Sequence, residues 1–247
     1  MAFGDIIQSN GGSGSGPTSF NATLPGAITA GNLVVIMVAS NNVPGGANTG
    51  WTKSTGLSPV NNAQSLLWWF IGAGGDTIPT VTFAGAANYA WRIVEYAGPF
   101  DASPYLTSAG AATNGVFSSA TSPAITPTAG SNALLVAGLG GQAGADTAWN
   151  VPSVTLGSFT NGYVNDSQQF RVAATEAHVA CQVSRVIASA SGAYSTTGAF
   201  SVASTSGGSC RLEMGIAFKQ GAGGGGGGGG GSVRGGGMML HMSRWMA

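Results

Sequence analysis

The sequence predicts an all-β protein, an antiparallel β-sandwich with an internal pseudo-repeat and a glycine-rich C-terminal tail. Short apolar runs rich in β-branched residues alternate with clusters of Gly, Pro, Asn and Ser, which is typical of strands and their turns. No segment shows the sustained 3.6-residue period of an amphipathic helix. Glycine dominates residues 221–237, so this stretch differs in composition from the chain before it.

Local patterns define the strands expected in the first half. Residues 33–39 are a continuous apolar run, which predicts a central strand buried on both faces. Residues 19–24 alternate apolar and polar side chains, which predicts a strand with one solvated face. Residues 10–16 are rich in Gly and Ser and are expected to form a flexible loop. The strands expected in this half are 1–8, 19–24, 33–39, 51–53, 66–71, 80–83 and 88–97.

The second half shows the same kind of pattern. Residues 170–187 alternate well but are long for one strand, so a bend is expected at 182–185. Residues 116–120 predict an added edge strand. The strands expected in this half are 116–120, 133–139, 154–159, 170–187, 199–203 and 210–218.

Residues 30–98 and 129–220 form a weak pseudo-repeat. Each stretch opens with a buried-strand run after an Ala-Gly pair, passes a tryptophan and closes on a strand that carries an arginine. Two matching sheets of one sandwich explain this similarity as well as two tandem domains do. No charged or Pro/Gly-rich linker separates the halves, so residues 1–220 are interpreted as one domain.

Composition excludes several classes of partner. Charged residues make up 6% of the chain, against roughly 25% in average soluble proteins. The eight basic and eight acidic residues cancel, and no basic stripe is present, so nucleic-acid binding is not expected. No polybasic segment or long apolar run predicts a membrane partner, and residues 1–5 show no secretory signal. A chain with few charges can gain solubility by incorporation into a large assembly.

No catalytic residue, cofactor site or metal site is predicted, and the protein is not expected to be an enzyme. His178 and Glu176 share a predicted strand face, but no Gly-x-Ser-x-Gly elbow accompanies them. Two cysteines and two histidines at scattered positions do not supply a zinc-ligand set. Cys181 and Cys210 are interpreted as buried thiols, with a disulfide between them as the alternative.

Two tryptophans are candidates for carbohydrate binding. Trp51 and Trp149 each follow a loop, where an exposed ring could stack on a sugar. The competing interpretation places these rings in the core, because large aromatic side chains dominate burial in a sandwich.

The C-terminal tail has two parts. Residues 221–237 are nearly all glycine, which has the largest backbone entropy to lose, so they are expected to act as a flexible tether. Residues 238–247 form an apolar anchor that either fills a groove of its own chain or docks into a partner subunit. The predicted anchor residues are Met238, Met239, Leu240, Met242, Trp245 and Met246.

Three short motifs carry a resemblance to a known group of proteins. GNLVV at 31–35, GWT at 50–52 and VEYAG at 94–98 resemble a β-sandwich module of tailed-bacteriophage virion proteins and related bacterial surface proteins. The resemblance covers residues 1–220 and implies a jelly-roll-like fold with a structural or adhesive role. It supplies no catalytic residues. The polyglycine run is similar to glycine-rich segments of phage adhesins, although those lie within a larger ordered domain.

These observations lead to a functional hypothesis and two alternatives. The first is a structural component of a phage virion, assembled in the host cytoplasm and joined to capsid or tail proteins, and to other copies of itself, through its termini. The second is a receptor-binding or carbohydrate-binding adhesin module of a phage fibre or bacterial surface, with a host-surface glycan as partner. The third is a bacterial surface protein exported without a classical signal.

Overall fold

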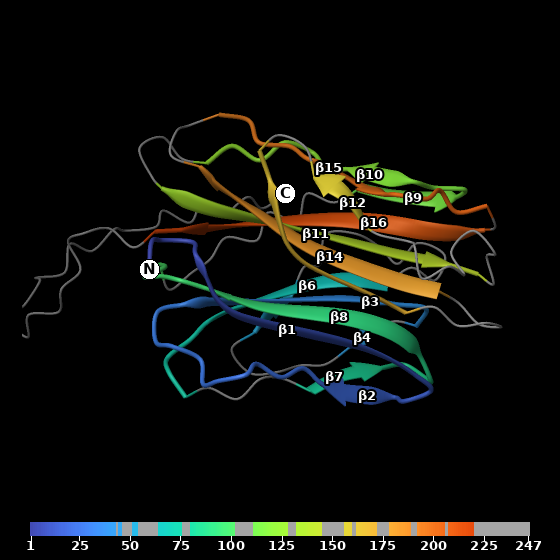
Figure 1. Ribbon diagram of the computed structural model, residues 1–247, viewed down its shortest axis with the longest axis horizontal. Coiled ribbons are helices and arrows are strands. Elements are labelled where there is room, and N and C mark those ends of the chain that lie inside the picture. The colour runs from blue at the N-terminus through green and yellow to red at the C-terminus, as the bar shows by residue number, and fades with distance from the viewer. Residues whose placement is uncertain are drawn as a thin grey trace, which may run out of the picture.

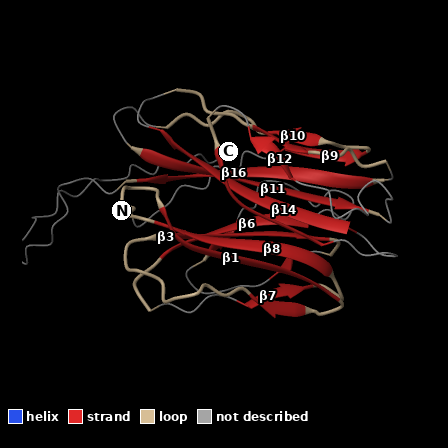
Figure 2. Cartoon of the chain, viewed as in Figure 1, coloured by secondary structure: helices blue, strands red, loops and turns tan. Residues whose placement is uncertain are grey.

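A computed structural model describes most of the chain as β-structure. It covers residues 1–42, 44–45, 51–53, 64–75, 80–101, 111–127, 132–144, 156–159, 162–171, 178–188, 192–205 and 207–219. Within these ranges every sheet is antiparallel and no helix is present (Figure 2). The predicted all-β class is confirmed.

The strands divide evenly between the two halves of the chain. Those of the first half are β1 (Ile6–Ser15), β2 (Ser19–Asn21), β3 (Leu33–Ser40), β4 (Pro44–Gly45), β5 (Thr52–Lys53), β6 (Gln64–Ile71), β7 (Thr80–Phe83) and β8 (Asn88–Tyr96). Those of the second half are β9 (Ala111–Gly115), β10 (Ser119–Thr121), β11 (Ala133–Ala143), β12 (Leu156–Phe159), β13 (Val164–Arg171), β14 (His178–Ala188), β15 (Thr197–Phe200) and β16 (Gly208–Phe218).

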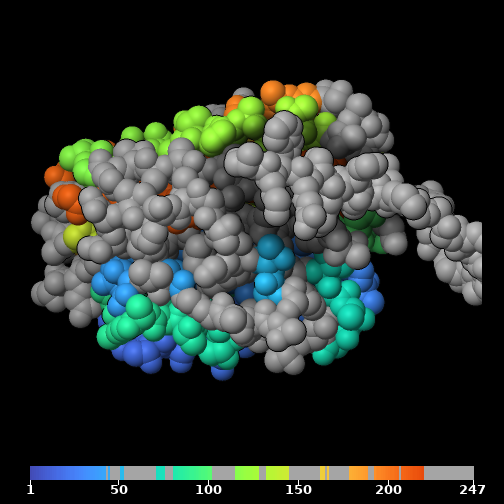
Figure 3. Space-filling model, turned by 180° about the vertical axis from the view of Figure 1, so that it is seen from behind, coloured from blue at the N-terminus to red at the C-terminus, as the bar shows by residue number. Residues whose placement is uncertain are grey.

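The strands form four layers (Figure 1). Two five-stranded sheets lie in the middle, with strand orders β1-β8-β3-β6-β5 and β13-β14-β11-β16-β9. A three-stranded sheet covers the outer side of each, with orders β2-β7-β4 and β10-β15-β12. The first half therefore builds two adjacent layers and the second half builds the other two. Seen from behind, the surface of the first half (blue to teal) lies below that of the second half (green to orange) (Figure 3).

The two halves repeat the same topology. Strands β1 to β8 take the same places in their sheets as β9 to β16 take in theirs. Several contacts between the middle sheets come in matching pairs. Strand β8 contacts β14, and their counterparts β16 and β6 are also in contact; β3 contacts β14, and their counterparts β11 and β6 are in contact too. Strand β3 also contacts its own counterpart, β11. These contacts have counterparts with the halves exchanged, as in an isologous, two-fold interface. Strand β13 also packs on β8 and β1, whereas its counterpart β5 makes no contact of similar extent with β16 or β9 in the described residues, so the two-fold relation is incomplete. That residues 1–220 form one domain stays a prediction.

Three apolar clusters fill the spaces between the four layers. One lies within the first half, one within the second, and the third is built from both middle sheets. Strand β3 contributes to two of them, because successive side chains of a strand point to opposite faces: Leu33 packs in the shared cluster and Val34 in the first-half cluster. Every residue of β3 is buried, which confirms the predicted central strand.

Strand β1 corrects one prediction. Residues 10–16 were expected to form a loop, but β1 continues to Ser15 and pairs with β8 along its length. A Cβ at Gly11 would lie 2.4 Å from Nη1 of Arg92, and one at Gly14 would lie 2.6 Å from the hydroxyl oxygen of Tyr89. The glycines are therefore needed because large side chains of β8 lie across them, not because the chain turns.

A second correction concerns residues 170–187, which were expected to form one long strand. Strand β13 ends at Arg171 and β14 begins at His178, and the two are antiparallel, with Arg171 opposite Val179. The predicted bend at 182–185 lies inside β14. Most of β13 is polar, so no apolar run in the sequence marks it as a separate strand.

Candidate functional site

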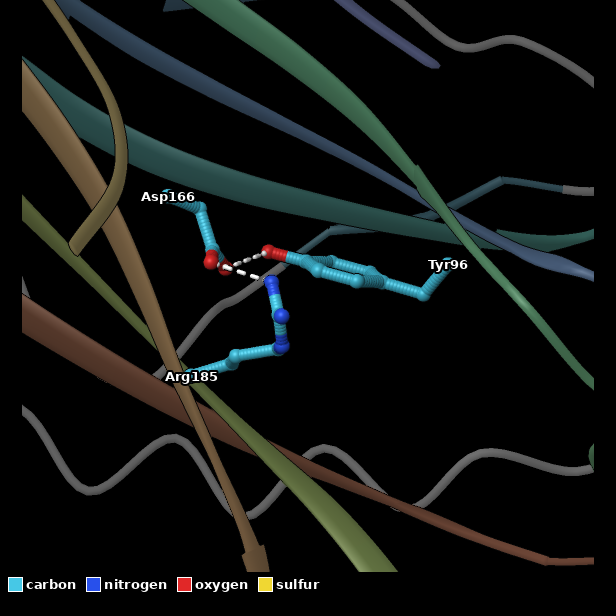
Figure 4. A network of polar contacts seen from close by, with 3 residues as sticks. All are labelled: Tyr96, Asp166 and Arg185. Atoms are coloured by element: carbon cyan, nitrogen blue, oxygen red, sulfur yellow. Dashed lines mark hydrogen bonds and ion pairs between the residues drawn. The ribbon is translucent and has the colours of Figure 1, made fainter. Parts of the chain in front are cut away.

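A polar network ties the first half of the chain to the second (Figure 4). Tyr96 ends β8, Asp166 lies in β13 and Arg185 lies in β14. The Tyr96 hydroxyl donates a hydrogen bond of 2.6 Å to Oδ2 of Asp166, and Nη1 of Arg185 forms an ion pair with Oδ1. The Arg185 guanidinium carbon lies 5.6 Å from the centroid of the Tyr96 ring, a cation–π distance. Each of the three groups thus contacts the other two.

Burial sets the protonation behaviour of this network. The Asp166 side chain is 1% exposed and that of Arg185 is 19% exposed. Burial raises the pKa of Asp166 to about 6, against the lowering effects of the Tyr96 hydrogen bond and of Arg185. Burial, together with the Asp166 charge, raises the pKa of Tyr96 well above its ordinary value. Tyr96 therefore remains a proton donor at neutral pH, and Asp166 is the member of the network that titrates.

A second polar cluster surrounds the buried carboxylate of Glu95 in β8. It accepts hydrogen bonds from Nε2 of Gln8 at 2.5 Å, from the backbone N–H of Thr29 at 2.9 Å and from Nδ2 of Asn32 at 2.7 Å. Asn32 in turn accepts a bond of 2.9 Å from the backbone N–H of Gly98. Several strong donors can hold a buried carboxylate without a cation, so this cluster is structural: it fixes the segment before β3 to strands β1 and β8.

Two arginines occupy matching strands of the two halves. Arg211 in β16 is buried and forms an ion pair of 2.7 Å with Glu213. Burial lowers the pKa of Arg211, and the Glu213 charge opposes that effect. Arg92 in β8 is half-buried, and its Nε makes no hydrogen bond within the described part of the chain. The two halves therefore share a backbone plan but differ in the charges they hold between the middle sheets.

The structure places only some of the residues predicted to bind partners. Trp51 immediately precedes β5, is half-buried and packs against the first-half cluster. His178 is 2% exposed in β14, whereas Glu176 is outside the described residues. Also outside them are Trp149 and the tail residues Met238, Met239, Leu240, Met242, Trp245 and Met246.

The two cysteines form no disulfide and lie in different clusters. Cys181 belongs to the cluster shared by the two halves and Cys210 to the cluster inside the second half. The interpretation of both as buried thiols is confirmed. Across the described ranges, no group of three His, Cys, Asp or Glu side chains could hold a metal ion. The same ranges contain no helix that is long and apolar enough to span a membrane.

Comparison of the chain with protein-family models, with curated proteins and with solved structures yields no match.

Sequence reasoning did not find the network of Tyr96, Asp166 and Arg185. One signal for it exists: in a chain with eight acidic and eight basic residues, a charged residue inside a strand is expected to have a specific partner. The pairing itself depends on how β13 stacks on β8, which local patterns do not reveal.

Proposed function

We propose that the chain is a non-enzymatic structural component of a phage virion, displayed on the capsid or tail and joined to neighbouring subunits through its termini. The body supplies a rigid, weakly charged β-structure, and the apolar anchor 238–247 on its glycine tether 221–237 supplies the attachment. Other virion proteins and further copies of the chain are the proposed partners.

We also propose that each half is a jelly-roll-like β-sandwich. In each half the first and last strands are neighbours in one sheet, and the second and seventh are neighbours in the other, as in a chain wound through two Greek keys. One departure from the ordinary pattern, in which eight strands divide evenly, is shared by both halves: β5 and β13 lie at the edge of the five-stranded sheets.

The position of the two ends of the body carries the proposal. Lys219, the last described residue, pairs with Phe100, and its Nζ lies 5.6 Å from the centroid of the Phe3 ring. Phe3 also packs on Phe100, with ring centroids 4.9 Å apart. Phe3 and Lys219 thus lie together at one place on the body, which supports a single contact region on a neighbour for both termini.

The test separates the anchor from the tether. Replacing the six anchor residues by serine should abolish incorporation into particles, because the apolar side chains that dock are gone. Replacing 221–237 by a Gly-Ser linker of equal length should preserve incorporation, because Gly/Ser-rich sequences have the flexible-coil character that is expected of a polyglycine tether. Incorporation is measured by immunoblot of purified particles, and folding by circular dichroism. Normal incorporation of the serine variant would contradict the proposal.

The half-buried Trp51 beside the short edge strand β5 favours a second candidate, a carbohydrate-binding adhesin module with a host-surface glycan as ligand. Trp51→Ala should then lower binding on a glycan array while the fold is retained. Absence of binding by the unaltered chain would remove this candidate.

A further inference from the structure

The edge strands of the four sheets differ in how they are protected. A sheet edge exposes unpaired backbone groups, and proteins blunt it with short strands, charges, proline or bulges. Six of the edge strands in the described ranges, β2, β4, β5, β9, β10 and β12, are between two and five residues long. Strand β13 is longer but carries Asp166 and Arg171 and is interrupted by a register shift between Asn165 and Ser167.

Strand β1 has none of these protections over most of its length. It is ten residues long and contains no charged residue and no proline. Among the described strands it pairs with β8 alone. Its one register shift lies between Ile6 and Gln8, so the pairing is regular from Gln8 to Ser15. The chain has no basic residue before Lys53, so no lysine from this segment guards the edge either.

Ser13 and Ser15 of β1 are exposed, and in the described ranges no strand pairs with the outer side of β1. The Gly16 N–H donates to the carbonyl oxygen of Ala87, so alternation along β1 directs the backbone groups of Gly11 outward, and the Gly11 N–H donates to Oδ1 of its neighbour Asn10. Because hydrogen-bonding direction alternates along an antiparallel strand, Ser9 and Ser13 also direct their backbone groups outward. Ser13 is exposed, and the side chains along this edge are small.

We propose that β1 pairs in antiparallel fashion with β1 of a second copy of this chain, so that the two first-half sheets become continuous. A homotypic pair sets Ser and Gly opposite Ser and Gly, so the paired strands bring no like charges of their own together. Arg92, which lies across Gly11, belongs to β8 and not to the paired strand. The formal net charge of the chain is zero, so two copies do not repel each other. Self-pairing about a two-fold axis is also the commonest way in which identical chains close an assembly.

A partner of a different kind would need side chains on β1 that select it. Recognition by strand addition takes its specificity from pockets for alternate side chains, and the serines and glycines of β1 form none. The second copy is therefore the occupant that the strand favours. The proposal requires neither a phage particle nor the tail and stands apart from the function proposed above.

The test uses the full-length chain in analytical ultracentrifugation at increasing concentration. The unaltered chain should dimerise, and Ser13→Lys should raise the dimer dissociation constant at least about tenfold, because it adds a charge to each edge at the pairing surface. Thr82→Lys is the matched control. It adds the same charge to an exposed position on β7, a strand with neighbours on both sides, and should leave dimerisation unchanged.

Hydrogen exchange keeps the proposal testable if Ser13→Lys fails to fold. In the unaltered chain, amides of residues 8–15 should become more protected as concentration rises, because the outward N–H groups gain partners. Three results would overturn the proposal. The unaltered chain could stay monomeric up to its solubility limit, the exchange rates of residues 8–15 could be independent of concentration, or folded Ser13→Lys could dimerise as strongly as the unaltered chain. A dimer that is lost when the anchor residues are replaced by serine but kept in Ser13→Lys would overturn it as well.

Discussion

The titration of Asp166 should make the stability of the protein depend on pH in a predictable direction. Its pKa is about 6 in the folded chain against an ordinary value of 3.8. Between these values the folded chain holds a proton that the unfolded chain releases, so the free energy of unfolding falls as pH rises from about 4 to about 6. A difference of about two pH units corresponds to about 3 kcal/mol. Above pH 6 to 7 this contribution no longer changes, because both states are deprotonated.

Two variants isolate this contribution. Asp166→Asn cannot titrate, so the difference in unfolding free energy between the unaltered chain and the variant should trace the fall between pH 4 and 6. Tyr96→Phe removes a hydrogen bond that lowers the Asp166 pKa, so the fall should extend to higher pH. Urea denaturation at each pH measures the free energies, and NMR titration of the Asp166 side-chain carbon measures the pKa directly.

The reasoning fails if the stability difference between the unaltered chain and Asp166→Asn is flat, or rises, from pH 4 to 6. It also fails if Tyr96→Phe moves the transition to lower pH. Either result would mean that the pairing with Arg185 outweighs the cost of burying the Asp166 charge.

Two further substitutions test packing and buried polarity, each with a matched control measured by urea denaturation. A Cβ at Gly98 would lie 2.1 Å from the carbonyl oxygen of Gly31, so Gly98→Ala should cost about 3 kcal/mol, whereas Gly207→Ala, with nothing within 4 Å, should change stability by less than about 0.5 kcal/mol. Equal effects would refute the packing argument. Glu95→Gln weakens a buried acceptor of three hydrogen bonds and should lower the free energy of unfolding by about 3 kcal/mol. The matched control Asp101→Asn, at an exposed carboxylate, should change it very little. A loss below about 1 kcal/mol would show that the Glu95 charge is dispensable.

Strands with a strong local signal could be predicted from the sequence. The apolar run of β3 and the alternation in β2 and β7 depend only on neighbouring residues, and the structure places strands there. Strand β1 could not be extended in this way, because its glycines read as a loop until Arg92 and Tyr89 are known to lie across them. The short strand β9 was missed because it depends on pairing with β16. Its partner residues there, such as Leu212 opposite Ala111, lie more than ninety residues away in the sequence.

The candidate site was harder to predict than the fold. The stacking of the two middle sheets brings together Tyr96, Asp166 and Arg185. Which strands stack on each other cannot be predicted from short stretches of sequence. Alternation along β8 puts Trp91 and Ile93 on one face, in the first-half cluster, and Val94 and Tyr96 on the other, in the shared cluster. What the alternation could not show is that the second face meets another sheet instead of water.

The duplicated plan of the chain has a consequence for how far association can proceed. A repeat copied without change would give the molecule two identical edge strands able to pair with other copies, and a molecule with two such edges assembles into a filament. Here the counterpart of β1 is β9, which has only five residues. Divergence between the two halves leaves one long, uncharged edge strand among the described residues. Pairing through that edge occupies it in both copies, so association ends at two chains.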